Sequence, residues 1–101
     1  MRTVIETPTF QKLAAKFWTD DERLAFIDWI AINPEAGDVI PGAQGARKIR
    51  WSQAGTGKSG GVRVIYFNVT KMEIVLLVTL YAKTVKANIT TSEISEVLRN
   101  E

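Results

Sequence analysis

The sequence has 101 residues, of which 46% are apolar and 24% charged, so it fits one globular domain over residues 1–101 with a single modest core. It contains no cysteine and no histidine, which excludes disulfides, thiolate metal sites and histidine-based acid–base catalysis. The net charge is +2; we expect neither a metal nor a cofactor, and any catalysis must use Lys, Arg, Tyr or carboxylate groups.

The N-terminal part of the chain predicts a short strand and a helix. Residues 3–6 are expected to form the strand, and Pro8 lies where a helix can begin. Apolar side chains then follow the i, i+3, i+4, i+7 spacing of a helix with one buried stripe, at Phe10, Leu13, Ala14 and Phe17.

A second helix is predicted next and completes a helical hairpin. Thr19 or Asp20 can cap it, and acidic residues in its first turn interact favourably with the helix dipole. Asn33-Pro34 ends it, because the residue before a proline is disfavoured in a helix. The inner stripe is expected at Leu24, Ile27 and Ala31, widened by Phe26 and Ile30.

The remaining chain predicts a loop, three strands and a last helix. Prolines and glycines mark residues 34–46 as the loop. The strands are expected at residues 46–52, 62–69 and 74–82, joined by a glycine-rich segment at 53–61 and a tight turn at 70–73. Thr91 or Ser92 can cap the final helix, whose apolar side carries Ile94, Val97 and Leu98. The order β-α-α-β-β-β-α predicts an α+β fold, with a helical hairpin packed on a twisted antiparallel sheet.

No segment indicates secretion or a membrane. The N-terminal sequence MRTVIETPTF lacks the apolar run of a signal peptide. The longest apolar stretch, residues 74–80, is interrupted by Thr79 and is too short to cross a bilayer. We therefore expect a cytoplasmic protein with no membrane partner.

Charge is distributed unevenly along the chain. Residues 1–38 carry four basic and seven acidic side chains, and residues 89–101 carry one basic and three acidic ones. Residues 39–88 carry eight basic side chains and a single acidic one. Such a local excess of positive charge attracts polyanions, which favours a nucleic-acid partner over a merely solubilising surface.

Strand alternation is expected to gather several of these cations on one face of the sheet. In the last strand, the core-facing series is Ile74, Leu76, Val78, Leu80 and Ala82. The opposite series is Val75, Leu77, Thr79, Tyr81 and Lys83. Lys48, Arg50 and Arg63 are expected to share that second face and to form a cationic patch there. Taken one by one, such residues are also common on the solvated outer face of an antiparallel sheet.

Residues 55–59, GTGKS, resemble the end of a phosphate-binding loop. The pattern needs a glycine where this chain has Ser52, and it needs a helix after the serine, where this chain predicts a strand. Nucleotide hydrolysis is therefore not expected, and Lys58 is instead a candidate contact for an RNA backbone.

Three segments resemble the RelE/ParE toxin superfamily, and within it the HigB-like branch. They are ARKIRW at 46–51, GVRVIYF at 61–67 and VLLVTLYAK at 75–83, and the resemblance covers nearly the whole chain. It implies the toxin of a type II toxin–antitoxin system with a RelE-like fold. RelE-type members enter the ribosomal A site and cleave the exposed codon, whereas ParE-type members inhibit gyrase.

The resemblance implies roles for individual residues. Lys48 and Arg50 match family residues that contact and polarise the RNA backbone, and Arg63 matches the arginine that stabilises the transition-state phosphate. Lys83 lies at or beside a basic residue of the family's last strand. Further candidate RNA contacts are Arg47, Lys58 and Lys86.

Two departures from the family pattern leave the general base unassigned. RelE itself has an arginine where this chain has Thr84, and a catalytic tyrosine near the position of Thr90. Candidates for moving the protons are Lys48, Lys83 and Tyr81.

Without histidine or a metal, the simplest RNA cleavage uses the substrate's own 2′-OH as nucleophile and leaves a 2′,3′-cyclic phosphate. Arg63 and Arg50 suit the stabilisation of the phosphate, because guanidinium groups match its oxygens bidentately. The expected function is a ribosome-dependent mRNA endonuclease that inhibits translation. A ParE-like gyrase inhibitor and a non-catalytic RNA-binding protein are the alternatives.

The resemblance also implies partners. A cognate antitoxin, HigA-like or RelB-like and itself DNA-binding, is expected to hold the toxin in check. The other partners are mRNA and the A site of the 30S ribosomal subunit, and operator DNA is reached only through the antitoxin.

Overall fold

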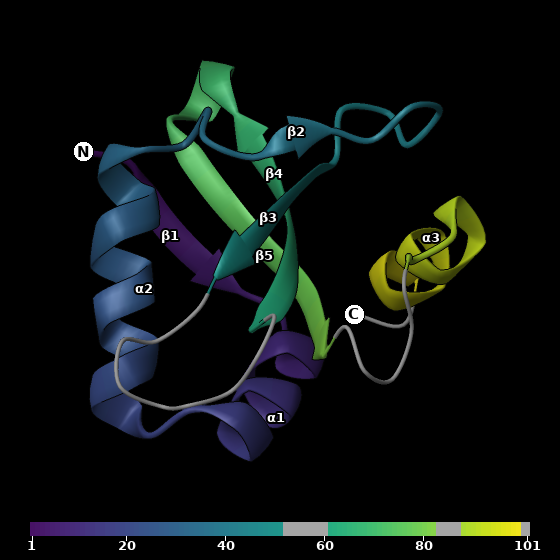
Figure 1. Cartoon of the computed structure of the whole chain (residues 1–101). Helices are drawn as coiled ribbons and strands as arrows, with labels where there is room; N and C mark the ends of the chain where they lie inside the picture. Colours follow the sequence, from purple (N-terminus) through teal and green to yellow (C-terminus); the bar gives the residue numbers. More distant parts are fainter. Residues whose placement is uncertain (52–60, 83–87, 100–101) are drawn as a thin grey trace.

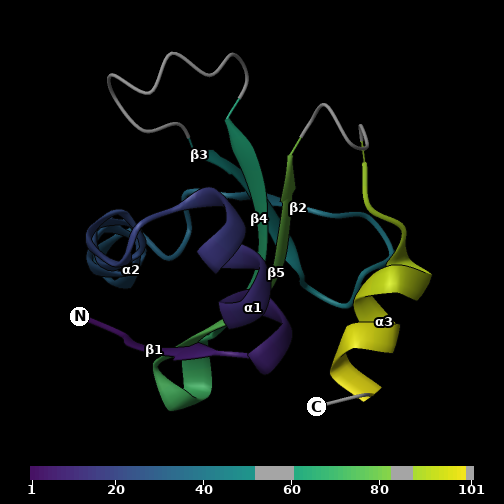
Figure 2. The ribbon, with the colours of Figure 1, turned by 90° about the horizontal axis from the view of Figure 1, so that it is seen from below.

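The computed structural model describes residues 1–51, 61–82 and 88–99. Within these residues a five-stranded sheet has the order β1-β5-β4-β3-β2, with helices on both faces (Figures 1 and 2). The strands are β1 (Thr3–Glu6), β2 (Asp38–Val39), β3 (Arg47–Trp51), β4 (Val62–Val69) and β5 (Ile74–Ala82). The helices are α1 (Pro8–Phe17), α2 (Asp20–Ile32) and α3 (Thr91–Arg99), and the short 3-10 helix η1 (Thr70–Met72) joins β4 to β5.

The α+β class predicted from the element order is confirmed. The sheet is mixed rather than purely antiparallel, because β1 pairs in parallel with β5 while the other pairs are antiparallel. A parallel pair needs a long crossover, and the chain between β1 and β5 supplies one. The two-residue strand β2 was not predicted, since it lies inside the segment that prolines and glycines mark as a loop.

Each of the α-helices α1, α2 and α3 is preceded by a threonine that caps it. The Thr7 hydroxyl accepts a hydrogen bond from Phe10 N ahead of Pro8, and Thr19 forms a reciprocal capping box with Glu22. At α3, Thr90 Oγ1 accepts from Glu93 N, and Glu93 Oε1 accepts from Thr90 N. The predicted caps of this last helix, Thr91 and Ser92, are therefore wrong by one or two positions.

The second helix buries a different stripe from the one predicted. Phe26 and Ile30 are fully buried and Ala31 is 4% exposed, while Ile27 is half-buried. Leu24 is 49% exposed, so its predicted place on the inner face is wrong. None of the described helices is long and apolar enough to cross a membrane.

Two hydrophobic clusters lie on the two faces of the sheet. The hairpin face is covered by α1 and α2, and Phe10, Phe26 and Ile30 pack there against β4 residues such as Val64 and Tyr66. The opposite face, here called the α3 face, is covered in part by α3 (Figure 2). Its cluster contains Ala43, Ala46, Ile65, Val78, Tyr81 and Ile94.

A bulge in β5 changes which of its side chains face the hairpin. The β4–β5 register passes from Ile65↔Thr79 to Tyr66↔Leu77 and so leaves Val78 as an extra residue. Leu80 therefore packs on the hairpin face, and Leu77 does so as well. A strict two-residue alternation cannot give this result.

The predicted core-facing series of β5 is consequently wrong on the β1 side of the bulge. Val75 and Leu77, expected on the cationic face, are fully buried on the hairpin face. Leu76 and Val78, expected in the core series, belong to the cluster on the α3 face. Beyond the bulge, toward Ala82, the predicted faces hold, and the cationic residues lie at that end of the sheet.

Candidate active site

Three side chains from three adjacent strands form a row across the α3 face. Arg50 of β3 pairs directly with Arg63 of β4, and Arg63 pairs with Tyr81 of β5. Directly opposite residues point to the same face, with Cβ atoms about 4.5–5.5 Å apart. Arg50 is exposed, Arg63 is half-buried and Tyr81 is 6% exposed. The sheet thus brings together Arg50, Arg63 and Tyr81, which we call the cationic row.

The cationic row holds two arginines directly opposite each other on neighbouring strands. Like charges directly opposite each other on neighbouring strands repel and destabilise a sheet. An anion between the guanidinium groups of Arg50 and Arg63 would remove this repulsion and accept bidentate hydrogen bonds from them. The pair therefore has the chemistry of a phosphate site, built on strands that fix its geometry.

Lys48 lies two residues before Arg50 on β3, and so on the same face. Its register neighbours are Ile65 and Thr79. Lys48 Nζ donates a hydrogen bond of 3.2 Å to Oδ1 of Asn88, which lies just ahead of α3. Sequence reasoning missed Asn88, because the contact joins residues 40 positions apart and no local pattern marks it.

The C-terminal helix lies next to the cationic row. Ile94 of α3 is 3% exposed and belongs to the same cluster as Ile65, Val78 and Tyr81. The ring of Tyr81 is therefore held by apolar packing, which fixes its position on the face. The sequence predicted the helix but gave no indication of which face it covers.

Arg47 is engaged in holding the loop between α2 and β2. Its guanidinium donates hydrogen bonds to the carbonyl oxygens of Gly37, at 2.7 Å, and Glu35, at 3.3 Å. Its register partner Tyr66 accepts a hydrogen bond from Gly37 N and donates one to Pro34 O. Burial raises the pKa of the Tyr66 hydroxyl above its usual 10.0, so the group stays a donor. An RNA contact by Arg47 stays a prediction.

The other predicted RNA-contacting lysines, Lys58 and Lys86, lie outside the described residues, as do Lys83 and the segment 52–60 that contains GTGKS. Their roles stay predictions. Across residues 1–51, 61–82 and 88–99, no group of three or more His, Cys, Asp or Glu side chains is arranged to hold a metal ion.

Comparison with known proteins identifies the architecture. No family model matches the sequence. The structure matches an arginine-substituted mutant of the E. coli toxin RelE in the free state, with a TM-score of 0.62 over 98% of this chain and 96% of that chain, at 14% identity. The fold is RelE-like. A chain of the intact E. coli RelBE toxin–antitoxin complex also matches, with a TM-score of 0.61 over 81% of this chain and 96% of that chain, at 15% identity.

The RelE-like fold agrees with the family resemblance drawn from the three strand segments. At these identities the likeness concerns the backbone architecture. The chemistry must therefore be argued from the side chains on that backbone, of which the cationic row and Lys48 are the most distinctive.

Proposed function

We propose that this protein is the toxin of a type II toxin–antitoxin system and that it cleaves mRNA in the ribosomal A site. The observation that carries the proposal is the pairing of Arg50 with Arg63 on a RelE-like sheet. Guanidinium groups on directly opposite residues of neighbouring strands can both donate to one anion on that face, and a phosphodiester is an anion of fitting geometry.

In the proposed reaction, the 2′-OH of one nucleotide attacks the adjacent phosphorus and the bond to the 5′ oxygen of the next nucleotide breaks. The products are a 2′,3′-cyclic phosphate and a 5′-OH, and neither a metal nor a cofactor takes part. Negative charge grows on the non-bridging oxygens, where the N–H groups of Arg63 and Arg50 can donate to it. Since strands hold both arginines, little reorganisation accompanies the reaction.

Two protons must move in this reaction. The attacking 2′-OH loses one, and the departing 5′ oxygen gains one. Lys48, held by Asn88, and Tyr81, held by its packing, are the described groups proposed for these transfers. Lys83 is a third candidate, and the ribosome would orient the message and contribute groups of its own.

The proposed partners follow from the same function. An unchecked nuclease would harm its own cell, so we propose a cognate protein antitoxin, HigA-like or RelB-like, encoded beside this chain. One of the matched structures is a toxin–antitoxin complex, which supports a partner of this kind. Operator DNA would be bound through the antitoxin, and the toxin would act in the cytoplasm.

Induction of the chain in bacteria tests the function. We expect protein synthesis to stop and new mRNA 5′ ends to appear inside translated codons. A reporter message without a start codon should remain uncut, because no ribosome presents its codons. Arrest of replication with gyrase-linked DNA breaks would contradict the proposal and favour a ParE-like gyrase inhibitor, and normal growth would contradict both.

A further inference from the structure

One edge of β5 is left open where β1 ends. β1 pairs with β5 from Thr3↔Ile74 to Glu6↔Leu77. Thr7 makes the last hydrogen bonds to this edge, since its N–H donates to Leu77 O at 3.1 Å and its hydroxyl donates to Val78 O at 2.6 Å. Beyond Val78 no strand of the described part of the chain lies on this side of β5, although β4 continues on the other side as far as Ala82.

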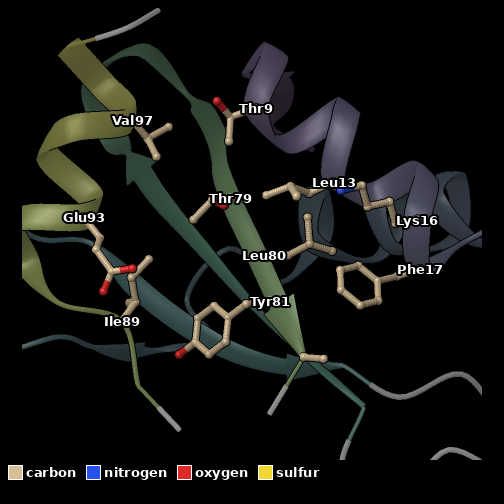
Figure 3. Close-up of a pocket in the computed structure, with 11 residues that line it drawn as sticks. Thr9, Leu13, Lys16, Phe17, Thr79, Leu80, Tyr81, Ile89, Glu93 and Val97 are labelled. Carbon is tan, nitrogen blue, oxygen red and sulfur yellow. The ribbon is translucent and has the colours of Figure 1, made fainter. Parts of the chain in front are cut away.

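A groove of about 470 Å³ runs along this open edge, with α1 as one wall and α3 as the other (Figure 3). Residues 79–82 of β5 form its floor. In Figure 3 the side chain of Leu80 points toward α1 and that of Thr79 points toward α3. Apolar side chains dominate the walls, with Leu13 and Phe17 on one side and Ile89 and Val97 on the other.

We propose that this groove binds an extended segment of a partner protein, which joins the sheet as a strand beside β5 and in line with β1. An open strand edge presents backbone donors and acceptors that another strand satisfies. A small apolar ligand would fit a volume of this size but would leave that edge unpaired. Alternate side chains of the guest strand face opposite walls of the groove, and both walls are mainly apolar. Consecutive residues of the guest strand are therefore expected to be apolar. This inference does not depend on RNA cleavage.

Charge adds a further requirement for the guest segment. Lys16 lines the groove from α1 and is exposed, and the salt bridge found among the described residues, Arg23–Glu6, does not involve it. On the opposite wall, the Glu93 carboxylate already accepts hydrogen bonds from Thr90. The guest is therefore expected to carry one Asp or Glu on the side that faces α1. Its apolar side chains would also touch Tyr81, which belongs both to the groove and to the cationic row.

Selection from a library of random octapeptides displayed on phage, with the full chain as target, tests the proposal. We expect enrichment of segments with four consecutive apolar positions followed or preceded by an acidic residue. A synthetic copy of the selected peptide should slow amide exchange at about two of residues 79–82, since alternate amides of a strand face one edge. Methylating the backbone nitrogens of that peptide should weaken binding at least about tenfold, because its side chains remain but its strand pairing is lost.

A pair of charge-reversal variants gives the matched control. Lys16→Glu should weaken the peptide up to about fivefold, as a partly exposed ion pair is worth up to about 1 kcal/mol. Lys12→Glu makes the same change one turn earlier on α1, at an exposed position outside the groove, and should leave binding unchanged.

Three results would overturn the proposal. One is the absence of any enriched peptide, and another is a peptide that keeps its affinity after backbone methylation, as a ligand held by side chains alone would. The third is self-association of the chain that slows the exchange of residues 79–82 without any peptide, which would assign the groove to a second copy.

Discussion

The substitution Tyr66→Phe tests whether one buried hydroxyl organises the loop that precedes the cationic strand β3. The Tyr66 side chain is fully buried, and its Oη lies 2.8 Å from Gly37 N and 2.9 Å from Pro34 O. Gly37 leaves room for this ring, since a Cβ added to it would lie 2.8 Å from Tyr66 Oη. Arg47 donates to Gly37 O from the other side of the same loop.

The magnitude follows from the two lost hydrogen bonds. Gly37 is buried, so its unpaired N–H costs about 1–3 kcal/mol, and the half-buried Pro34 carbonyl adds about 0.5–1.5 kcal/mol. We expect the free energy of unfolding to fall by about 2–3 kcal/mol. For a domain of this size, that lowers Tm by roughly 10–20 °C.

Thermal melting of the wild type and of Tyr66→Phe measures this effect, with cleavage or growth inhibition at a permissive temperature as the control. The cationic row lies on the opposite face, so activity of the folded variant should be retained. In a domain of this size, a loss of 1 kcal/mol in stability lowers Tm by about 4–8 °C. A Tm of Tyr66→Phe within about 2 °C of the wild type would therefore refute the role assigned to the hydroxyl.

Three further predictions concern pH, a helix cap and the candidate RNA contact Lys58. The Tyr66 pKa is raised in the folded state, so the unfolded chain loses this proton first, and the free energy of unfolding should fall as pH rises above about 10, by at most about 1.4 kcal/mol per pH unit. Chemical denaturation at several pH values should show a shallower decline for Tyr66→Phe than for the wild type. Equal slopes for the two proteins would contradict the assignment. Thr19→Ala should lower the free energy of unfolding by about 1 kcal/mol and Thr19→Ser should restore it, whereas an unchanged midpoint for Thr19→Ala would count against the capping box. Lys58→Ala should weaken RNA binding and reduce the slope of log K against log salt by about 1, with an unchanged slope arguing against a phosphate contact.

The local elements were predictable because their signals are local. Helix starts at Pro8 and after Thr19, and the bounds of the strands Val62–Val69 and Ile74–Ala82, follow from capping, proline chemistry and apolar patterning. The shared face of Arg50, Arg63 and Tyr81 also followed from alternation, since no irregularity interrupts the strands at that end.

The β5 bulge was not predictable, because residues 74–78 are all apolar and nothing among them marks Val78 as the extra residue. A single inserted residue breaks the alternation between the two parts of the strand, so a pattern that is right for residues 79–82 places Val75 and Leu77, before the bulge, on the wrong face. An apolar side chain can be buried on either face of this sheet. Consecutive apolar residues therefore lack the alternation of polar and apolar side chains from which the facing of a strand is predicted.

Contacts between distant residues were equally out of reach. The hydrogen bond from Lys48 to Asn88 and the packing of Ile94 beside Tyr81 depend on where α3 docks. The apolar side of α3 predicts that it packs, but not on which face. The same holds for β2, whose two residues pair with β3 directly after a loop that Tyr66 and Arg47 hold by hydrogen bonds from distant positions.

Cleavage of a message on programmed ribosomes by Arg63→Ala tests the central claim most directly. Loss of one preorganised donor to the transition-state phosphate should lower cleavage by about 10²–10³-fold. Melting should change little, because Arg63 is only half-buried and substitutions outside the core usually change stability by no more than about 0.5 kcal/mol. Arg63→Lys should restore only part of the activity, since an ammonium cannot form the bidentate fork. A folded Arg63→Ala protein that cleaves at nearly the wild-type rate would contradict the account.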